Sequence, residues 1–289
     1  MMEKKIALLG TGLMGGRIAV RLAANGFKVS VYNRTVSKAK ELEKEGIKVY
    51  TELPPAVADN DVIITMLSDY KAINSVLFSG QTPLFEGKTL IQMSTVAPDE
   101  NLMIKRAVEK MGGSFIEAPV LGGITQAQNG ELIVMVGSSR KLFEEFSDLF
   151  SVLGNTVKYV GETGQAAALK LSYNQLIATM NTAFCMSLGY IMEKGIDVNL
   201  FMETLRGSTL YAPAFDKKLD NFINRSYDST NFSLKLLLKD VNLIEGEFEK
   251  NRVDSLTLKG VKFLLERGIH FEHGEKDYSA LFEVIYPHK

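Results

Sequence analysis

A glycine-rich turn near the start of the chain constrains its fold more than any other feature. An apolar run over residues 6–9 leads into the sequence Gly10-Thr11-Gly12-Leu13-Met14-Gly15, and a helical pattern with an apolar face follows it. A second apolar run over 28–32 completes a strand–helix–strand unit, which predicts parallel strands. Glycines in this position allow a tight turn and close approach of a pyrophosphate, which the N–H groups of the helix N-terminus can bind. We therefore predict a dinucleotide-binding turn, with a purely structural turn as the alternative.

Valine usage divides the chain into two parts. Residues 1–161 contain 16 valines and the remaining residues contain five. Because β-branched residues favour strands, the first part should hold a largely parallel sheet covered by helices, and the second part should be helical. The predicted strands are 4–9, 28–32, 47–50, 61–66, 89–93, 114–118, 131–136 and 156–160. The predicted later helices are 163–193, 198–206, 236–250, 254–267 and 278–285, with Asp197, Asp254 and Asp277 as N-caps.

These patterns predict two domains joined by a long interdomain helix: residues 1–162, which bind a nucleotide, and the all-α residues 163–289. Composition narrows the possible partners. The 33 basic and 34 acidic side chains give a net charge of −1, so we expect no nucleic-acid partner. The most apolar long stretch, 171–192, contains Asn174, Gln175 and Asn181, so we expect no membrane partner. Cys185 is the only cysteine, which fits a reducing compartment, and we expect a cytoplasmic protein.

The residues that could transfer a proton are few. All three histidines lie at or after position 270, and His270, His273 and the glutamates beside them resemble a solvated loop more than a metal site, so we predict no metal. The proton donor should then be Lys, Tyr, Asp or Glu. Lys170 and Asn174 are four residues apart and share a helix face, although this spacing alone is nearly uninformative.

The segment after the second strand reads Asn33-Arg34-Thr35. An acidic residue at this point would accept hydrogen bonds from the adenine ribose and repel a 2′-phosphate, whereas an arginine can pair with that phosphate. We therefore predict that NADP(H) is preferred and that NAD(H) is possible. The alternative is that Arg34 is only a solvated surface charge.

Ordered motifs over nearly the full length resemble the β-hydroxyacid dehydrogenase family, which includes 3-hydroxyisobutyrate dehydrogenases and glyoxylate/succinic semialdehyde reductases. The glycine turn alone would be shared by many families, but the ordered set is specific. The matching segments are LGTGLMGGRIA (9–19), YNRT (32–35), TMLSD (65–69), MSTVAPDE (93–100), EAPVLGG (117–123), NGELIVMVG (129–137), Gly164 with Lys170 and Asn174, and Phe232 with Lys239-Asp240.

The resemblance implies a Rossmann-type N-terminal domain, an all-helical C-terminal domain and a set of site residues. Lys170 would be the catalytic lysine, and Asn174 would hold the substrate beside it. The implied cofactor contacts are Gly10, Gly12, Leu13, Met14, Gly15, Asn33, Arg34, Thr35, Met66, Leu67, Thr95 and Lys239. The implied substrate contacts are Ser94, Leu121, Gly122, Gly123 and Phe232. Without the resemblance, Lys239-Asp240 would be interpreted as a surface ion pair, and Phe232 as an ordinary core aromatic.

The implied reaction is NADPH-dependent reduction of a small carboxylate-bearing aldehyde, glyoxylate or succinic semialdehyde, to the hydroxyacid. Lys170 would donate the proton and the Gly122-Gly123 backbone would bind the carboxylate. Three departures from the family pattern bear on the substrate. Leu121 replaces a common serine, Gln175 replaces the second residue of a common asparagine pair, and Met186 replaces a frequent glutamate. A 3-hydroxyisobutyrate dehydrogenase is one alternative, and a non-catalytic dinucleotide-binding scaffold is another; Lys170 argues against an imine reductase. The family also implies a homodimer or homotetramer.

Overall fold

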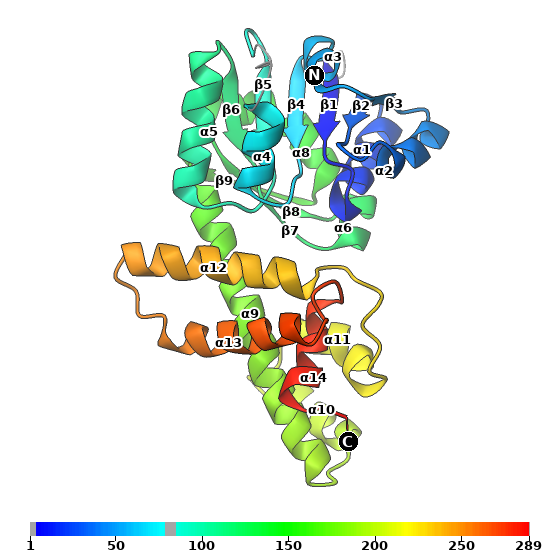
Figure 1. Ribbon diagram of the computed structural model, residues 1–289, viewed down its shortest axis with the longest axis vertical. Helices are drawn as coiled ribbons and strands as arrows, with labels where there is room; N and C mark the ends of the chain where they lie inside the picture. Colours follow the sequence, from blue (N-terminus) through cyan, green and yellow to red (C-terminus); the bar gives the residue numbers. More distant parts are fainter. Residues whose placement is uncertain (1–3, 79–84, 289) are drawn as a thin grey trace. The chain divides into compact units, whose positions relative to one another are not determined.

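The computed structural model describes residues 4–78 and 85–288, and it divides into two compact units, Met1–Leu171 and Ser172–Lys289. The first unit is built on one sheet (Figure 1). Its strand order is β3-β2-β1-β4-β5-β6-β8-β7, and β9 pairs with β8. The strands are β1 (Lys5–Leu9), β2 (Lys28–Tyr32), β3 (Lys48–Tyr50), β4 (Val62–Thr65), β5 (Thr89–Gln92), β6 (Ser114–Glu117), β7 (Val120–Leu121), β8 (Ile133–Gly137) and β9 (Thr156–Gly161).

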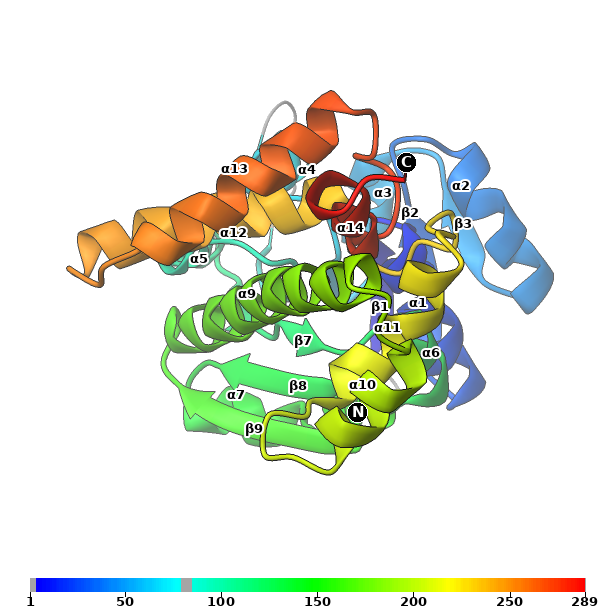
Figure 2. The same cartoon turned by 90° about the horizontal axis from the view of Figure 1, so that it is seen from below.

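Along the sheet, strands β3, β2, β1, β4, β5 and β6 are all parallel to their neighbours. Strand β8 runs antiparallel to both β6 and β7. Figure 2 shows β7, β8 and β9 beside one another. The helices of the unit are α1 (Leu13–Ala24), α2 (Ser37–Lys40), the 3-10 helix η1 (Glu41–Glu45), α3 (Leu53–Ala58), α4 (Tyr70–Leu77), α5 (Pro98–Lys110), α6 (Ile124–Asn129), α7 (Arg140–Glu145) and α8 (Ser147–Leu153).

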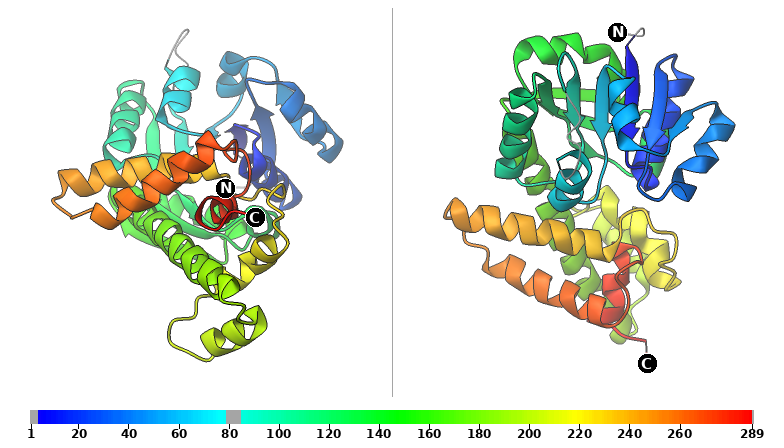
Figure 3. Two further views of the ribbon diagram at one scale, coloured as in Figure 1. Left: turned by 60° about the horizontal axis from the view of Figure 1, so that its bottom comes forward. Right: turned by 45° about the horizontal axis from the view of Figure 1, so that its top comes forward.

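Alternation along the central strands produces two apolar cores, one on each face of the sheet. Ile6 and Leu8 of β1 pack in a cluster with residues of α1, α6 and α8. Ala7 and Leu9 of the same strand pack in another with residues of α3, α4 and α5. Successive side chains of a strand point to opposite faces, so a strand buried on both faces has a continuous apolar run, as β1 and β4 do. Helices on both faces are visible in Figure 3.

The second unit is helical. Helix α9 (Gln165–Glu193) begins in the first unit and supplies most of its length to the second. It is followed by α10 (Val198–Arg206), α11 (Pro213–Ile223), α12 (Leu234–Lys250), α13 (Leu256–His270), the 3-10 helix η2 (Tyr278–Ala280) and α14 (Leu281–Ile285). Figure 2 shows α12 and α13 side by side. An aromatic cluster forms the core, in which Phe184 stacks on Phe215 with ring centroids 4.5 Å apart and Phe222 meets Phe282 edge-on.

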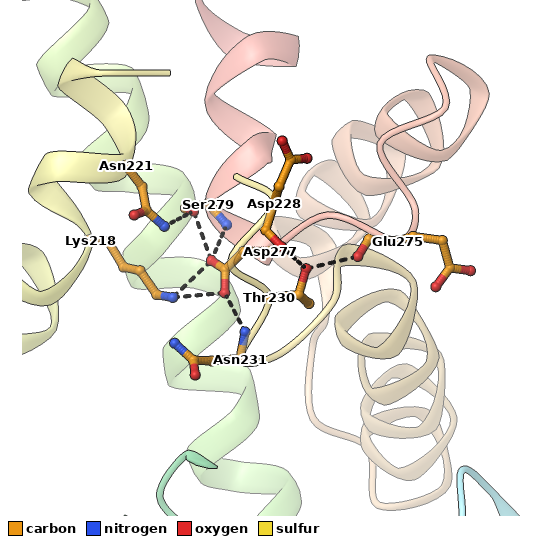
Figure 4. A network of polar contacts seen from close by, with 8 residues as sticks. All are labelled: Lys218, Asn221, Asp228, Thr230, Asn231, Glu275, Asp277 and Ser279. Atoms are coloured by element: carbon orange, nitrogen blue, oxygen red, sulfur yellow. Dashed lines mark hydrogen bonds and ion pairs between the residues drawn. The ribbon is translucent and has the colours of Figure 1, made fainter. Parts of the chain in front are cut away.

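A buried ion pair ties three segments of the helical unit together (Figure 4). Lys218 of α11 donates to both carboxylate oxygens of Asp277 at 2.8 Å, and Asp277 is fully buried. The same carboxylate accepts hydrogen bonds from the backbone N–H of Asn231 at 3.2 Å and from the hydroxyl of Ser279 at 2.7 Å. Because Lys218, Asn231 and Ser279 all donate to one carboxylate, Asp277 fixes the segment that precedes α12.

The predicted α/β unit and helical unit are both present, and each predicted strand is found within a residue or two of its bounds. Two elements were missed: the two-residue strand β7, and α11, whose first residue is a proline. Asp197 and Asp277 are N-caps as predicted, but Asp254 is not. The N-cap of α13 is Ser255, and Asp254 instead accepts from the N–H of Leu256 at 2.8 Å. Among the described residues, no helix is both long and apolar enough to span a bilayer.

Candidate functional site

The carboxyl ends of four parallel strands lie at one edge of the sheet and carry most of the predicted cofactor residues. The register pairs Leu9 with Tyr32 and with Thr65, and Thr65 with Gln92. The segments that follow these ends are the glycine turn, Asn33-Arg34-Thr35, Met66-Leu67 and Ser94-Thr95. In an open parallel sheet this edge is where ligands bind, and the structure brings these four segments together there.

The three glycines of the turn have different surroundings: two are required by close packing, and the third borders open space. Gly10 has φ +103°, and a Cβ there would lie 2.4 Å from the carbonyl oxygen of Met66. A Cβ on Gly15 would lie 1.9 Å from the carbonyl oxygen of Gly10, so this glycine permits close packing of α1 on the turn. Gly12 is the N-cap of α1, has no side-chain cap, and a Cβ there would meet no atom within 4 Å. The space beside Gly12 and the uncapped helix N-terminus fit a pyrophosphate.

The turn and the segment after β2 are tied together by Asn33. Its Oδ1 accepts a hydrogen bond from the N–H of Thr11 at 3.2 Å, and its Nδ2 donates to the carbonyl oxygen of Thr35 at 2.8 Å. Arg34, held between these contacts, is exposed and makes no ion pair or hydrogen bond with another described residue. The hydroxyl of Thr11 is buried and has no partner within the described chain. Both groups are therefore available to a bound dinucleotide.

Ser94 lies 2% exposed after β5. Its Oγ accepts a hydrogen bond from the N–H of Leu67 at 2.7 Å, which joins the segments after β4 and β5. Because this contact uses Oγ as an acceptor, the hydroxyl proton of Ser94 can still be donated to a substrate oxygen. Thr95, next in the chain, is half-buried.

The glycine pair after β7 is only partly arranged for a ligand. Gly122 is exposed and has φ +141°, a conformation that favours glycine. The N–H of Gly123, however, donates to Oε1 of Gln126 at 2.9 Å. A carboxylate bound by the Gly123 N–H would therefore have to displace the Gln126 side chain. Leu121, half-buried, pairs with Ile133 of β8.

A buried carboxylate holds the beginning of α9. Glu117, the last residue of β6, is fully buried, and its Oε1 accepts from the N–H groups of Gly164, Ala166 and Ala167 at 2.8, 2.8 and 3.3 Å. Burial raises the pKa of this carboxyl to about 7, and the N–H donors oppose that rise because they stabilise the charged form. Lys170 follows on the same helix and is only 9% exposed, which is unusual for a lysine.

In the helical unit, Asn174 and Lys239 meet at one buried aspartate. Asp240 is 1% exposed and accepts from Nδ2 of Asn174 at 2.5 Å, and the Lys239 ammonium lies 2.8 Å from its other oxygen. The pair Lys239-Asp240 is therefore not a surface ion pair. Asn174 is 2% exposed, and its Oδ1 has no hydrogen-bond partner in the described part of the chain. A buried amide oxygen without a partner is costly, and a substrate hydroxyl could satisfy it.

Phe232 follows Asn231, whose backbone N–H donates to Asp277 of the buried ion pair. Its carbonyl oxygen accepts from the N–H of Tyr278 at 2.9 Å, and its ring meets that of Tyr278 edge-on at 6.0 Å. The ring is half-buried, and the segment on either side is fixed by Asp277 through the N–H of Asn231 and a bridge to Ser233.

Sequence reasoning missed four buried polar residues: Gln92, Asn101, Glu117 and Asp240. Glu117 lies inside a motif that was noted, and Asp240 was noted only as a partner of Lys239. For Gln92 and Glu117 the available signal was a polar residue at the end of an apolar strand. Asn101 and Asp240 lie in helices, where no such signal exists.

Two family models match consecutive parts of the chain. The family model of the NAD binding domain of 6-phosphogluconate dehydrogenase matches residues 5–161. The model described as the NAD-binding part of NADP-dependent 3-hydroxyisobutyrate dehydrogenase matches residues 164–285.

Curated relatives and solved structures extend the similarity to the whole chain. The chain is 32% identical to glyoxylate/succinic semialdehyde reductase 1 of Arabidopsis thaliana, covering 97% of this chain and 98% of that protein. It is 29% identical to human (Homo sapiens) cytokine-like nuclear factor N-PAC, covering 98% of this chain and 51% of that protein. A 3-hydroxyisobutyrate dehydrogenase structure from Salmonella typhimurium superimposes with a TM-score of 0.88 at 17% identity, over 98% of this chain and all of that one.

The glycine turn at the carboxyl edge, the helical unit and these full-length matches lead to one assignment. The chain belongs to the β-hydroxyacid dehydrogenase family and is an NAD(P)-dependent dehydrogenase acting on CH–OH groups.

Proposed function

We propose that the protein uses NADPH to reduce a small aldehyde bearing a carboxylate, glyoxylate or succinic semialdehyde, and that Lys170 donates the proton. The observation that carries the substrate class is the full-length match to the plant enzyme whose name states these two substrates. When bound, the reduced nicotinamide supplies the hydride that reduces the carbonyl carbon. The Lys170 ammonium stabilises the negative charge that develops on the carbonyl oxygen and gives its proton to that oxygen.

The remaining site residues take supporting roles in this proposal. The turn and the start of α1 bind the dinucleotide phosphates, through Gly10, Gly12, Leu13, Met14 and Gly15. Met66, Leu67, Thr95 and Lys239 contact the cofactor, and Asn33-Arg34-Thr35 binds its adenosine end, with Arg34 favouring the 2′-phosphate of NADP. The proposed substrate contacts are Ser94, Leu121, Gly122, Gly123 and Phe232. Asn174 uses its unpartnered Oδ1 to bind the reacting hydroxyl.

A specific test uses Lys170→Ala and Lys170→Met. Without the ammonium, we expect kcat to fall by about three orders of magnitude, while the Kd for NADPH changes little, because general acid catalysis alone supplies about 10²–10⁴-fold. The measurements are oxidation of NADPH at 340 nm with glyoxylate and succinic semialdehyde, and NADPH binding by fluorescence titration. A parallel loss of NADPH binding would show that Lys170 is structural.

The second candidate is oxidation of 3-hydroxyisobutyrate with NAD(P)+. It is favoured by the family model of residues 164–285, which is named for such an enzyme. The same assay with methylmalonate semialdehyde ranks it against the first proposal. The non-catalytic alternative requires that NADPH binds tightly and no aldehyde is turned over.

We further propose a homodimer or homotetramer in the cytoplasm, with functional domains 1–162 and 163–289. Large apolar side chains along α9 support self-association, since Leu176, Met186 and Tyr190 are at least half exposed. Analytical ultracentrifugation tests the oligomeric state, and a monomer at micromolar concentration would refute it. Cell fractionation tests the compartment.

A further inference from the structure

Three buried polar side chains of the first unit, those of Glu117, Asn101 and Gln92, form one continuous hydrogen-bonded chain that ends on the backbone of Ser94. We call these four residues the Glu117 relay. It starts at α9, where Oε1 of Glu117 accepts three backbone N–H groups. The other oxygen, Oε2, accepts from Nδ2 of Asn101 at 2.6 Å. Glu117 and Gln92 end neighbouring strands in register, and Asn101 reaches them from α5.

The relay continues to the segments after β4 and β5. Oδ1 of Asn101 accepts from Nε2 of Gln92 at 2.8 Å, and Oε1 of Gln92 accepts from the N–H of Ser94 through a short contact. Nε2 of Gln92 also donates to the carbonyl oxygen of Ser94 at 3.0 Å, and Oγ of Ser94 accepts from Leu67. No member of the relay is more than 2% exposed, so water cannot substitute for a lost contact at low cost.

The carboxylate sets the direction of the hydrogen bonds at its end of the relay. A primary amide can be turned end for end, but an ionised carboxylate only accepts. Asn101 must therefore present Nδ2 to Glu117 and Oδ1 to Gln92. Gln92 must then present Nε2 to Asn101, which leaves its Oε1 for the N–H of Ser94. The backbone of Ser94 requires the same orientation of Gln92, because its N–H can only donate and its C=O can only accept. The charge at the end of β6 and the Ser94 backbone therefore agree on the orientation of both amides, and neither amide can turn without losing a contact.

The fold makes room for this carboxylate. Gly137 of β8 is the register partner of Glu117, and a Cβ at Gly137 would lie 2.3 Å from its Oε1. The carboxylate occupies the volume that any side chain at 137 would fill, so its place against the start of α9 is tightly defined.

We propose that Glu117 is a positioning residue, which through the relay holds both the beginning of the Lys170 helix and the Ser94 segment in the arrangement that catalysis needs. This inference rests on the proposed function for the roles of Lys170 and Ser94. Glu117 touches neither substrate nor cofactor in the proposal; it acts through the backbone of 164–167 and through the two amides.

The test uses three variants: Glu117→Gln, Asn101→Asp and the double variant. In Glu117→Gln the new amide places a donor against Nδ2 of Asn101, and relief requires both amides of the relay to turn, which sets Nε2 of Gln92 against the N–H of Ser94. In the double variant the carboxylate moves one link along. The amide at 117 then donates to it, Gln92 donates to it from the other side, and the direction of every other contact is restored.

We expect Glu117→Gln to lower kcat for aldehyde reduction by about 100-fold, the size of effect that a misplaced catalytic group produces, while the Kd for NADPH stays near wild type. With 4-deuterated NADPH, the isotope effect on kcat should rise because chemistry becomes slower. The double variant should recover most of the lost kcat. The matched control is Asn60→Ala, a buried asparagine before β4 whose side chain bonds to Ser30 and Ala56; it should lower the melting temperature but leave kcat and the isotope effect unchanged.

Amide hydrogen exchange followed by NMR tests the relay without any turnover. Glu117→Gln should speed exchange at Gly164 and Ala166 and also at Leu67 and Ser94, and the double variant should restore protection at the second pair. Faster exchange at 164 and 166 alone, or an unchanged kcat, would overturn the relay. If the wild type reduces no aldehyde, the proposed function fails, and the exchange pattern alone decides the relay. If Glu117→Gln does not fold, a folded double variant with wild-type exchange at Ser94 supports the relay, and a double variant that is unfolded overturns it.

Discussion

Arg34 is the residue on which cofactor preference should depend. It is exposed after β2, held by the contacts of Asn33 on either side, and makes no ion pair with a described residue. A charge-assisted hydrogen bond to phosphate contributes about 1.5–3 kcal/mol. We therefore expect Arg34→Glu to lower kcat/KM for NADPH by about 10- to 100-fold and to leave kcat/KM for NADH unchanged or raised. Steady-state kinetics with both cofactors measure this. The control is Arg106→Glu, the same charge change at an exposed position of α5, which should alter kcat/KM for neither cofactor. Equal losses with both cofactors would contradict it.

Single residues were predictable where a local rule fixes their role. Gly10, Gly12 and Gly15 follow from the turn that a strand, a phosphate and a helix require; the structure gives Gly10 and Gly15 a steric reason and leaves open space beside Gly12. Glu117 and Asp240 could not be predicted in this way. Their roles depend on partners 47 to 66 residues away in the chain, which no local pattern specifies. The N–H of Gly123 shows the same limit, because its engagement by Gln126 depends on how the first turn of α6 is closed.

At the scale of elements, the Lys218–Asp277 pair should stabilise the helical unit. Removing one partner of a buried pair leaves the other charge buried and uncompensated, at a cost of about 3–5 kcal/mol. We expect Asp277→Asn to lower the free energy of unfolding by about this amount and to loosen the Phe232 segment, while Glu275→Gln, which breaks the exposed Lys235–Glu275 pair of the same unit, should cost less than about 1 kcal/mol. Urea unfolding measures both. Similar small losses would show that the buried pair contributes little.

Elements were predictable in proportion to their length and regularity. Strands β1 and β4 are nearly continuous apolar runs because both faces of the sheet are covered, and such runs are easily recognised. Strand β7 has two residues, too few for any period, and it exists because β8 pairs with it in the antiparallel sense. Helix α11 is amphipathic, but a charged residue, Lys218, lies on its buried face and obscures the apolar pattern. Lys218 can be buried there because Asp277 compensates its charge.

For the molecule as a whole, Glu117 should make stability depend on pH near neutrality. Burial raises its pKa from the ordinary 4.5 to about 7, so between these values the folded state binds the proton that the unfolded state has released. The protonated carboxyl stabilises the fold fully below about pH 4.5, and that contribution is lost as the pH rises through 7. Since a full pKa unit corresponds to about 1.4 kcal/mol, the contribution is about 3 kcal/mol.

Burial of Glu117 therefore lowers the stability of the fold at neutral pH, where the carboxyl is ionised. Its N–H donors offset part of this desolvation cost. Glu117→Gln removes the titration, so the difference in unfolding free energy between wild type and variant should shift in favour of the wild type by up to about 3 kcal/mol from pH 7.5 to pH 4.5. Parallel urea titrations at several pH values measure this difference, in which the other carboxylates cancel. A difference that is flat across this range would mean that Glu117 keeps an ordinary pKa in the fold, and that its four donors fully offset its burial.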